Sequence, residues 1–256
     1  MKSSHALHIR ISGLTASFRL PLLISGTQIS APVPLYSTLL GLISACAGRI
    51  IQPKDTKIGF EFRCKYRDIE IERKDQMGVK KGKLKRTGKP TSPRDFRPHI
   101  RINEEGITGF IEEIPQGVGY RQVYWYPQLD LYLTNINLRS AFETPTATPT
   151  LGRSQDIAWI VFVREIELYP SKNGEIGPTL LPKAQIGVPG LIVRAPEWME
   201  NTKEGYVREP GISGVYQAIN PLTNNRFKVE GEDFYHPSDA DNEADVIYLH
   251  KWFKGT

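Results

Sequence analysis

The sequence predicts a mixed α+β fold built around an antiparallel sheet. Short segments in which every second residue is apolar recur along the chain, as in half-buried strands, and one segment has the apolar spacing of a helix. The chain has 256 residues, of which 39% are apolar and 24% are charged, so it is long enough to bury a substantial core. This composition excludes a disordered protein.

The first predicted strand covers residues 5–12. Leu7, Ile9 and Ile11 alternate with other residues, which is the period of a strand with one buried face. His8 lies on the opposite face of this strand and is interpreted as a surface residue rather than a catalytic base.

A helix is predicted between Pro34, which suits its first turn, and Gly48, which suits its end. The apolar residues of this segment recur at helical spacing; they are Leu35, Leu39, Leu42, Ile43 and Cys46. This is the clearest helix in the sequence.

Further strands are predicted after this helix. Residues 58–64 alternate, and Ile69 and Ile71 are also expected to face inward, but the two sets have opposite parity, which predicts a bend near residues 65–68. The later strand segments, with one short helix at "NLRSAF", are "QLDLYLT", "IAWIVFVREIELYP", "GLIVRA", "GVYQAI", "RFKVEG" and "DVIYLHKWF". The continuous apolar run in the second of these is typical of a central strand.

The order of these segments is strand, helix, strand, insertion, strand, short helix, strand. This order is compatible with a ferredoxin-like or RNA-recognition fold that carries a long insertion. The predicted domains are a core at residues 1–170, interrupted by a basic insertion at 73–121, and a β-rich C-terminal extension at 171–256.

The insertion concentrates the positive charge of the chain. Between Arg73 and Arg101 there are eleven Lys or Arg residues and two acidic residues, whereas the net charge of the whole chain is only +5. Such asymmetry favours an anionic partner, with nucleic acid ahead of an acidic protein or membrane surface, and the alternative is a solvated loop. The candidate RNA-binding residues, with Phe96 as a stacking platform, are Lys80, Lys81, Lys83, Lys85, Arg86, Arg94, Phe96, Arg97 and Arg101.

Several classes of protein are not favoured. Cys46 and Cys64 are interpreted as core thiols of a reduced, cytoplasmic protein, and the five His residues lack metal-ligand spacing. No phosphate-binding loop or dinucleotide fingerprint occurs, so we expect no metal and no cofactor. The longest apolar run, "LLGLISACAG", is about half the length that spans a bilayer, so no membrane partner is expected.

Three segments together resemble a known family. "GLTASFRLP", "SAPVPLYSTLLGLISACAGR" and "TPTLGRSQDIAW", in this order, are similar to motifs of the fifth family of CRISPR-associated proteins, which are RAMP-type subunits of type I Cascade complexes. The matching positions are Phe18 and Arg19, Pro32 and Pro34, Ser37 to Gly41, and Leu151 to Ser154. The resemblance covers roughly residues 7–162.

The resemblance implies a RAMP core with a long basic β-hairpin, called a thumb, and a non-catalytic role. Such a subunit binds and caps the 5′ handle of crRNA, contacts the backbone and large subunits of Cascade, and lies near the target DNA. The residues that it implies for RNA binding outside the insertion are Phe18, Arg19, Tyr36, Ser37, Arg49, Gly152, Arg153 and Ser154.

One branch of this family cleaves precursor CRISPR RNA with a Tyr near the first helix and a Lys-His pair. Tyr36 occupies a comparable position, but the insertion has no Lys-His pair; His99 follows Pro98, and His250 precedes Lys251 near the C-terminus. The sequence therefore predicts an RNA-binding protein, with a metal-independent endoribonuclease as the alternative.

Overall fold

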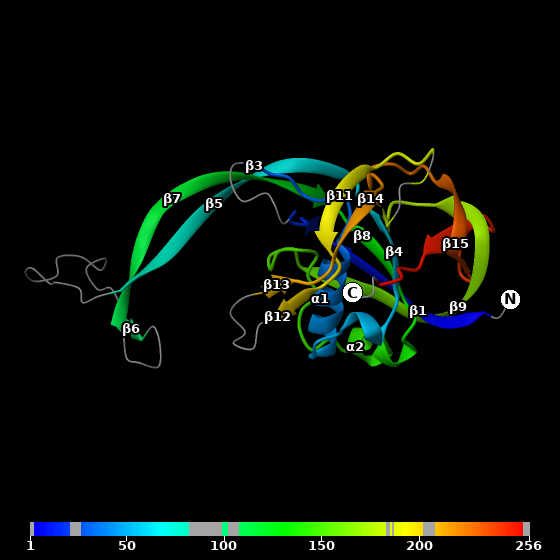
Figure 1. Ribbon diagram of the computed structural model, residues 1–256, viewed down its shortest axis with the longest axis horizontal. Helices are drawn as coiled ribbons and strands as arrows, with labels where there is room; N and C mark the ends of the chain where they lie inside the picture. The colour runs from blue at the N-terminus through cyan, green and yellow to red at the C-terminus, as the bar shows by residue number, and fades with distance from the viewer. Residues whose placement is uncertain are drawn as a thin grey trace, which may run out of the picture. The chain divides into compact units, whose positions relative to one another are not determined.

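Six strands form the main sheet of the protein, in the spatial order β15-β16-β9-β1-β8-β4 (Figure 1). The computed structural model describes residues 3–20, 27–81, 99–101, 108–182, 185, 187–201 and 208–252. The strands of the main sheet are β1 (Ser4–Gly13), β4 (Ile58–Arg63), β8 (Gln128–Leu133), β9 (Ala158–Ile176), β15 (Phe227–Pro237) and β16 (Asp245–Tyr248).

Two helices connect the strands at the centre of this sheet. Helix α1 (Tyr36–Ala47) follows β1, and helix α2 (Arg139–Glu143) follows β8. Strand β1 pairs antiparallel with β8 and β9, and β8 pairs antiparallel with β4. The chain order β1-α1-β4-β8-α2-β9 and the spatial order β9-β1-β8-β4 are those of a β-α-β-β-α-β unit. The predicted α+β class is confirmed.

One face of the sheet carries the core. Ile9 lies opposite Leu131 in the β1–β8 register, and both side chains are fully buried. Leu39 of α1 and Phe142 of α2 belong to the same buried cluster, so both helices pack on this face. Burying one such apolar side chain contributes about 1.5–3 kcal/mol, which explains why the alternating segments form strands here.

One end of α1 lies where the sequence predicted it, and the other does not. The helix ends at Gly48, whose φ of 64° is left-handed and whose N–H donates to the Ala45 carbonyl at 3.4 Å, as predicted. It begins at Tyr36, with Leu35 as the preceding cap residue. The prediction that Pro34 lies in the first turn is therefore wrong, because the chain is still extended there.

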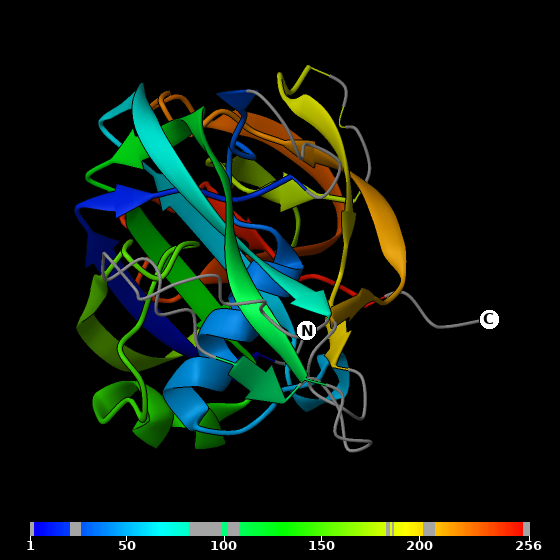
Figure 2. The same cartoon turned by 90° about the vertical axis from the view of Figure 1, so that its left-hand side faces the viewer.

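A second sheet begins where the sequence predicts a bend. Strand β5 (Tyr66–Lys81) starts three residues after β4 ends and pairs with β7 (Thr108–Trp125), and Figures 1 and 2 show the two side by side. The expectation that Ile69 and Ile71 face inward is wrong: they are 55% and 72% exposed. These two residues have the spacing of a strand, but neither side chain is buried.

The chain divides into two compact units. One, here called the ribbon unit, comprises residues 25–27 and 70–121, and the other, the core unit, comprises residues 1–24, 28–69 and 122–256. The remaining short elements that pair with β7 are β2 (Thr15–Ala16), β3 (Thr27–Gln28) and β6 (His99–Arg101). The predicted core boundary at residue 170 falls inside β9, and the predicted domains stay a prediction.

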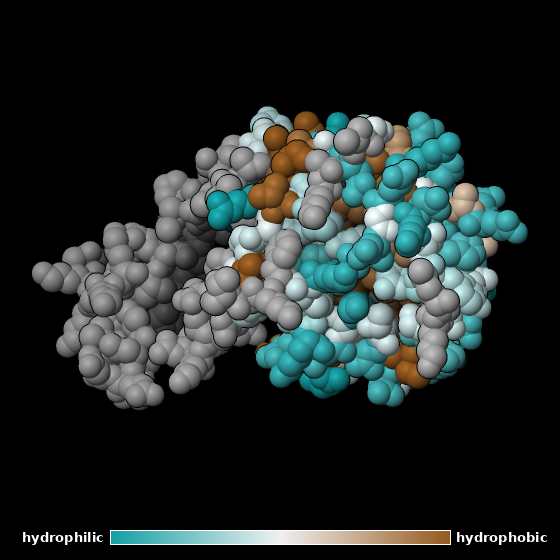
Figure 3. All heavy atoms as spheres, turned by 45° about the vertical axis from the view of Figure 1, so that its right-hand side comes forward, coloured by the Kyte–Doolittle hydropathy of each residue, from teal (hydrophilic) through white to brown (hydrophobic). Residues whose placement is uncertain are grey.

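The C-terminal third is strand-rich, as predicted. A three-stranded sheet has the order β10 (Leu180–Leu181), β14 (Ser213–Ala218) and β11 (Leu191–Pro196), and β12 (Met199–Asn201) pairs with β13 (Arg208–Pro210). Two short 3-10 helices cover Pro53–Asp55 and Ile136–Leu138. On the face drawn in Figure 3, hydrophilic residues cover most of the coloured surface, and apolar residues gather in separate patches.

Candidate nucleic-acid interface

Two motifs that the sequence analysis selected separately lie against each other in the core unit. The Ser17 N–H donates to the Leu151 carbonyl at 3.1 Å, and the Thr15 hydroxyl donates to Asp156 Oδ1 at 2.7 Å. The segment that carries Phe18 and Arg19 is thereby held beside the turn at residues 151–156. This contact could not be predicted from the sequence, because nothing in either motif identifies the other as its partner.

Gly152 makes this approach possible. Its φ is +112°, a conformation that side chains with a Cβ rarely adopt, and a Cβ added here would lie 2.0 Å from the Ser17 carbonyl oxygen. The close neighbour of Gly152 is the protein's own backbone, and RNA binding at this turn stays a prediction.

Arg153 stabilises the same turn from within. Its guanidinium binds Asp156 through two hydrogen bonds, Nε to Oδ2 at 2.9 Å and Nη2 to Oδ1 at 2.8 Å. The Arg153 backbone N–H also donates to Oδ2, at 3.1 Å, and Asp156 is fully buried. A bidentate pair of this kind fixes geometry. The Arg153 charge is thus balanced by Asp156, whereas the neighbouring Ser154 is exposed.

An aromatic and cationic cluster lies where β5, β7 and β2 meet. Thr15 pairs with Trp125, and the Lys65 N–H donates to the Trp125 carbonyl at 3.0 Å, so the three segments run side by side. The Tyr66 ring stacks on Trp125 with 5.9 Å between centroids, and the Lys65 ammonium lies 5.0 Å from the Tyr126 ring centroid. Tyr66 and Tyr126 are each 46% exposed, which leaves ring surface free for contact.

Arg19 is a further exposed cation of the core unit. It forms an isolated antiparallel bridge with Ser30 and follows β2 in the chain. Arg67, on β5, is exposed as well. Cations interleaved with exposed rings are the combination that single-stranded nucleic acid requires, since phosphates take the charges and bases take the rings. Arg19 was among the residues predicted from the sequence, but Lys65, Tyr66 and Arg67 were not. These three form a run of basic and aromatic residues at the predicted bend, and that run could have identified them.

Two candidate side chains are buried instead. Phe18 is 1% exposed and packs edge-on against Phe62 at 5.1 Å. Tyr36 is also 1% exposed, and its hydroxyl donates to the Leu180 carbonyl at 2.7 Å. Neither side chain presents surface for RNA in this structure, and RNA binding at these two positions stays a prediction.

Residues distant in sequence keep Tyr36 in the core. Its ring stacks on His250 with 3.9 Å between centroids, and His250 Nε2 lies 2.5 Å from Glu197 Oε1. Burial raises the pKa of Tyr36 well above its usual range. A hydroxyl so placed is not presented to an RNA phosphate.

The other candidates lie apart. Ser37 is half-buried, and the residues that precede it, 33–36, are all buried, so the N-terminus of α1 is not open to a phosphate. Arg49 is exposed just after α1. Lys80, Lys81 and Arg101 lie on strands of the ribbon unit. The candidates outside the described residues are Lys83, Lys85, Arg86, Arg94, Phe96 and Arg97.

The sheet face opposite the helices holds a second polar cluster. His8 Nε2 lies 3.0 Å from Asp130 Oδ1, and His8 Nδ1 lies 2.6 Å from Asp239 Oδ2. His8 is 4% exposed, so the interpretation of it as a surface residue is wrong. Burial lowers the pKa of His8, but the hydrogen bonds and charges of the two carboxylates outweigh burial and raise it above its ordinary value of about 6.5.

This cluster makes stability depend on pH. Because the pKa of His8 is higher in the folded than in the unfolded protein, its contribution is fully present below about pH 6.5 and is lost as the pH rises through the folded value. We expect urea unfolding to show a larger drop in unfolding free energy between pH 6 and pH 9 for the wild type than for His8→Gln. The exposed His5→Gln is the control; an equal drop in His8→Gln and wild type would contradict the assignment.

The remaining polar groups do not form a metal or redox site in the described part of the chain. Among those residues, no group of three or more His, Cys, Asp or Glu is placed to hold a metal ion. Burial raises the pKa of Cys46 to about 11 and that of Cys64 to about 12, so both thiols stay protonated at neutral pH. No helix within the described ranges is long and apolar enough to cross a membrane.

Comparisons with known proteins bear on the fold. No family model and no curated protein matches the sequence. A chain of a CRISPR RNA-guided surveillance complex has a TM-score of 0.50 and 12% identity to this chain, over 88% of this chain and 91% of that one. A CRISPR protein from Archaeoglobus fulgidus has a TM-score of 0.45 and 9% identity, over 96% and 100% of the two chains. The first similarity shows a shared fold.

Proposed function

We propose that this protein is a CRISPR-associated protein of the RAMP superfamily, a member of Cas family five within a type I Cascade complex. In this role it binds and caps the 5′ handle of crRNA. The fold shared with a chain of an RNA-guided surveillance complex supports the assignment, and so do the three motifs that resemble the family.

The observation that carries the RNA-binding role is the cluster of Lys65, Tyr66 and Tyr126, with Arg19 as a further exposed cation on the segment after β2. It combines exposed rings with exposed cations on adjoining segments of the core unit. Stacking of one base on such a ring contributes about 1–3 kcal/mol, and each neutralised phosphate adds a salt-dependent term. The basic stretch from Arg73 to Arg101, a continuation of β5 in the chain, supplies the larger share of positive charge.

The partners follow from this role. The protein holds crRNA while it contacts the backbone and large subunits of the complex, and target DNA lies nearby and is recognised by pairing with the RNA. The complex works in the cytoplasm. Neither a cofactor nor a membrane is required.

We propose that the protein itself is not a nuclease. The Tyr that the family resemblance would assign to cleavage is Tyr36. Its side chain is buried, and its hydroxyl donates a hydrogen bond to a backbone carbonyl. Labelled repeat RNA should therefore remain intact when it is incubated with the purified protein in EDTA.

The interface can be tested by the combined variant Arg19→Glu, Lys65→Glu and Tyr66→Ala. We expect the affinity of the assembled complex for a repeat-derived 5′ handle RNA to fall about 10–100-fold, because one stacking ring and two cations are lost. Fluorescence anisotropy at two salt concentrations measures the effect.

The matched control changes the same residue types at exposed positions elsewhere: Arg194→Glu, Lys172→Glu and Tyr169→Ala. Affinity of the control should equal that of the wild type. If the interface variant binds as tightly as its control, the cluster is not the RNA-binding surface.

A further inference from the structure

The first half of β9 forms an open edge of the main sheet. Along one side, β9 pairs with β1 from Ala158 to Leu168, but on its other side it pairs with β15 only from Leu168 onward. At the two ends of the open stretch, the Ala158 N–H donates to the Pro149 carbonyl at 2.9 Å, and the Glu167 carbonyl accepts from the Ser238 N–H at 2.8 Å. Between them, no backbone hydrogen bond links a described residue to the outward side of the strand.

Along β9, the backbone N–H and C=O groups of every second residue point away from β1, and these groups could bond to an added strand. The Glu167 N–H and C=O both point away from β1, since they bond to Ser238. The β1–β9 register is regular from Phe162 to Leu168, so the N–H and C=O of Val163 and Glu165 point the same way. Four consecutive donor and acceptor sites of a strand are therefore unpaired within the described structure.

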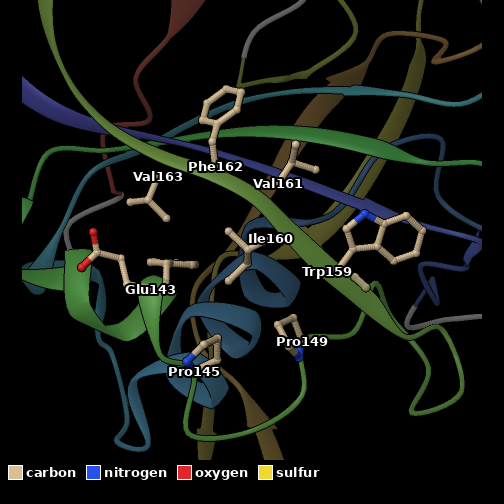
Figure 4. A pocket seen from close by; sticks show the side chains of 10 residues that line it. Glu143, Pro145, Pro149, Trp159, Ile160, Val161, Phe162 and Val163 are labelled. Carbon is tan, nitrogen blue, oxygen red and sulfur yellow. The ribbon is translucent and has the colours of Figure 1, made fainter.

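A hollow lies beside this edge. It has a volume of about 460 Å³ and is lined by Phe142, Glu143, Pro145, Pro149, Ile160 and Val163, among others. In Figure 4, Ile160 and Val163 point from β9 toward the side of the strand where Pro145 and Pro149 lie. An extra strand beside β9 would direct every second side chain into this space.

Apolar side chains also flank the edge on the opposite face. Trp159 and Val161 are 49% and 52% exposed, and Ile157, just before the strand, is 56% exposed. The sequence pattern had suggested that this apolar run is fully buried, as in a central strand, and that expectation is wrong for these residues. An apolar, unpaired sheet edge is a template for pairing with another chain.

The charge at this edge indicates which kind of partner fits. Arg139 donates to Glu143 at 2.7 Å and to Glu165 at 3.0 Å, so two carboxylates share one guanidinium and one negative charge remains. The exposed Arg164 of the same strand lies over the Phe162 ring, so the excess carboxylate is confined to the side of the edge next to α2, where it attracts a Lys or Arg. The alternating N–H and C=O groups also match a peptide backbone, which nucleic acid does not offer.

We propose that an extended segment of another protein subunit adds to β9 as a further strand beside residues 159–166. An apolar side chain of that segment fills the hollow, and a Lys or Arg lies beside Glu143 and Glu165. The inference rests on the proposed function for the assembly that supplies the subunit.

Hydrogen exchange tests this inference in the assembled complex. The complex is formed from this protein, guide RNA and the subunits encoded beside it, and exchange of the peptide covering residues 159–166 is followed by mass spectrometry. We expect the Val163 and Glu165 amides to exchange at least about 10-fold more slowly in the complex than in the isolated protein. Guide RNA alone should leave their exchange unchanged.

Two matched variants test the apolar contribution. Val161→Lys places a charge at the edge and should weaken assembly at least about 10-fold, whereas Val215→Lys, at a residue 56% exposed on β14, should leave it unchanged. Circular dichroism of both variants checks that each is folded, and the exchange measurement on the wild type stands without them.

Several results would overturn the inference. Unchanged exchange in a complex that still assembles and binds guide RNA would refute the added strand and leave the proposed function intact. Slowing by guide RNA alone would assign the edge to RNA, and slowing that grows with concentration of the isolated protein would assign it to a second copy. Failure of the wild type both to assemble and to bind RNA would refute the proposed function as well.

Discussion

Replacing Gly152 by alanine is expected to lower the free energy of unfolding by about 2–6 kcal/mol. Two costs combine: a residue with a Cβ held at φ +112° is strained by about 1–3 kcal/mol, and the new Cβ would lie 2.0 Å from the Ser17 carbonyl oxygen. Relieving that contact requires a backbone shift, for which overpacking data give about 1–3 kcal/mol more. Urea unfolding measures the sum.

Two other glycines separate these costs. Gly187 also has a positive φ, +81°, but an added Cβ there meets nothing within 4 Å, so Gly187→Ala should show only the conformational cost. Gly41 lies in α1 with open space around it, and Gly41→Ala should stabilise the protein by about 1 kcal/mol. If Gly152→Ala costs no more than Gly187→Ala, the close approach to Ser17 is not what requires glycine.

Local patterns predicted the central elements of the fold. The alternation at residues 5–12 and in "QLDLYLT" corresponds to β1 and β8, because each strand buries one face against the helices. Gly48 ends α1 for the local reason that only glycine readily adopts its left-handed conformation. Such signals depend on a few neighbouring residues, so the sequence alone contains them.

Other features depend on contacts between distant segments. Ile69 and Trp159 have strand periodicity, but their exposure is decided by which elements cover them, and alternation cannot tell a covered face from an open one. Tyr36 is buried because His250, more than two hundred residues later, stacks on its ring. The pairing of Ser17 with Leu151 is of the same kind.

Only part of the candidate site could be predicted from the sequence, because some of its features depend on contacts between distant segments. Arg19 is exposed as expected of a residue that contacts a ligand, whereas Arg153 is bound by Asp156 three residues later. Lys65 and Tyr66 gain their significance only when β5, β7 and β2 lie side by side. Composition identified the basic insertion at once, since charge is additive along a sequence and needs no fold.

The central claim is that the basic insertion holds guide RNA, and reversing its charge tests this claim with the largest expected effect on function. The variant changes Lys80, Lys81, Lys83, Lys85 and Arg86 together to Glu. Losing about five phosphate contacts to a single strand should make the negative slope of log affinity against log salt shallower by about 3.5. We expect affinity for the 5′ handle to fall about 100-fold or more near physiological salt.

A control with the same change in net charge isolates the position of the charges. It replaces five exposed cations of the core unit, Lys54, Lys57, Lys172, Arg194 and Lys228, by Glu. General electrostatic attraction alone would weaken both variants equally.

The most direct measurement is therefore the affinity of the assembled complex for repeat-derived handle RNA, titrated over salt for the wild type and these two variants. We expect tight binding by the wild type, a large loss of affinity with a shallower salt dependence for the insertion variant, and a much smaller loss for the control. Equal affinities for the insertion variant and the control would contradict this expectation.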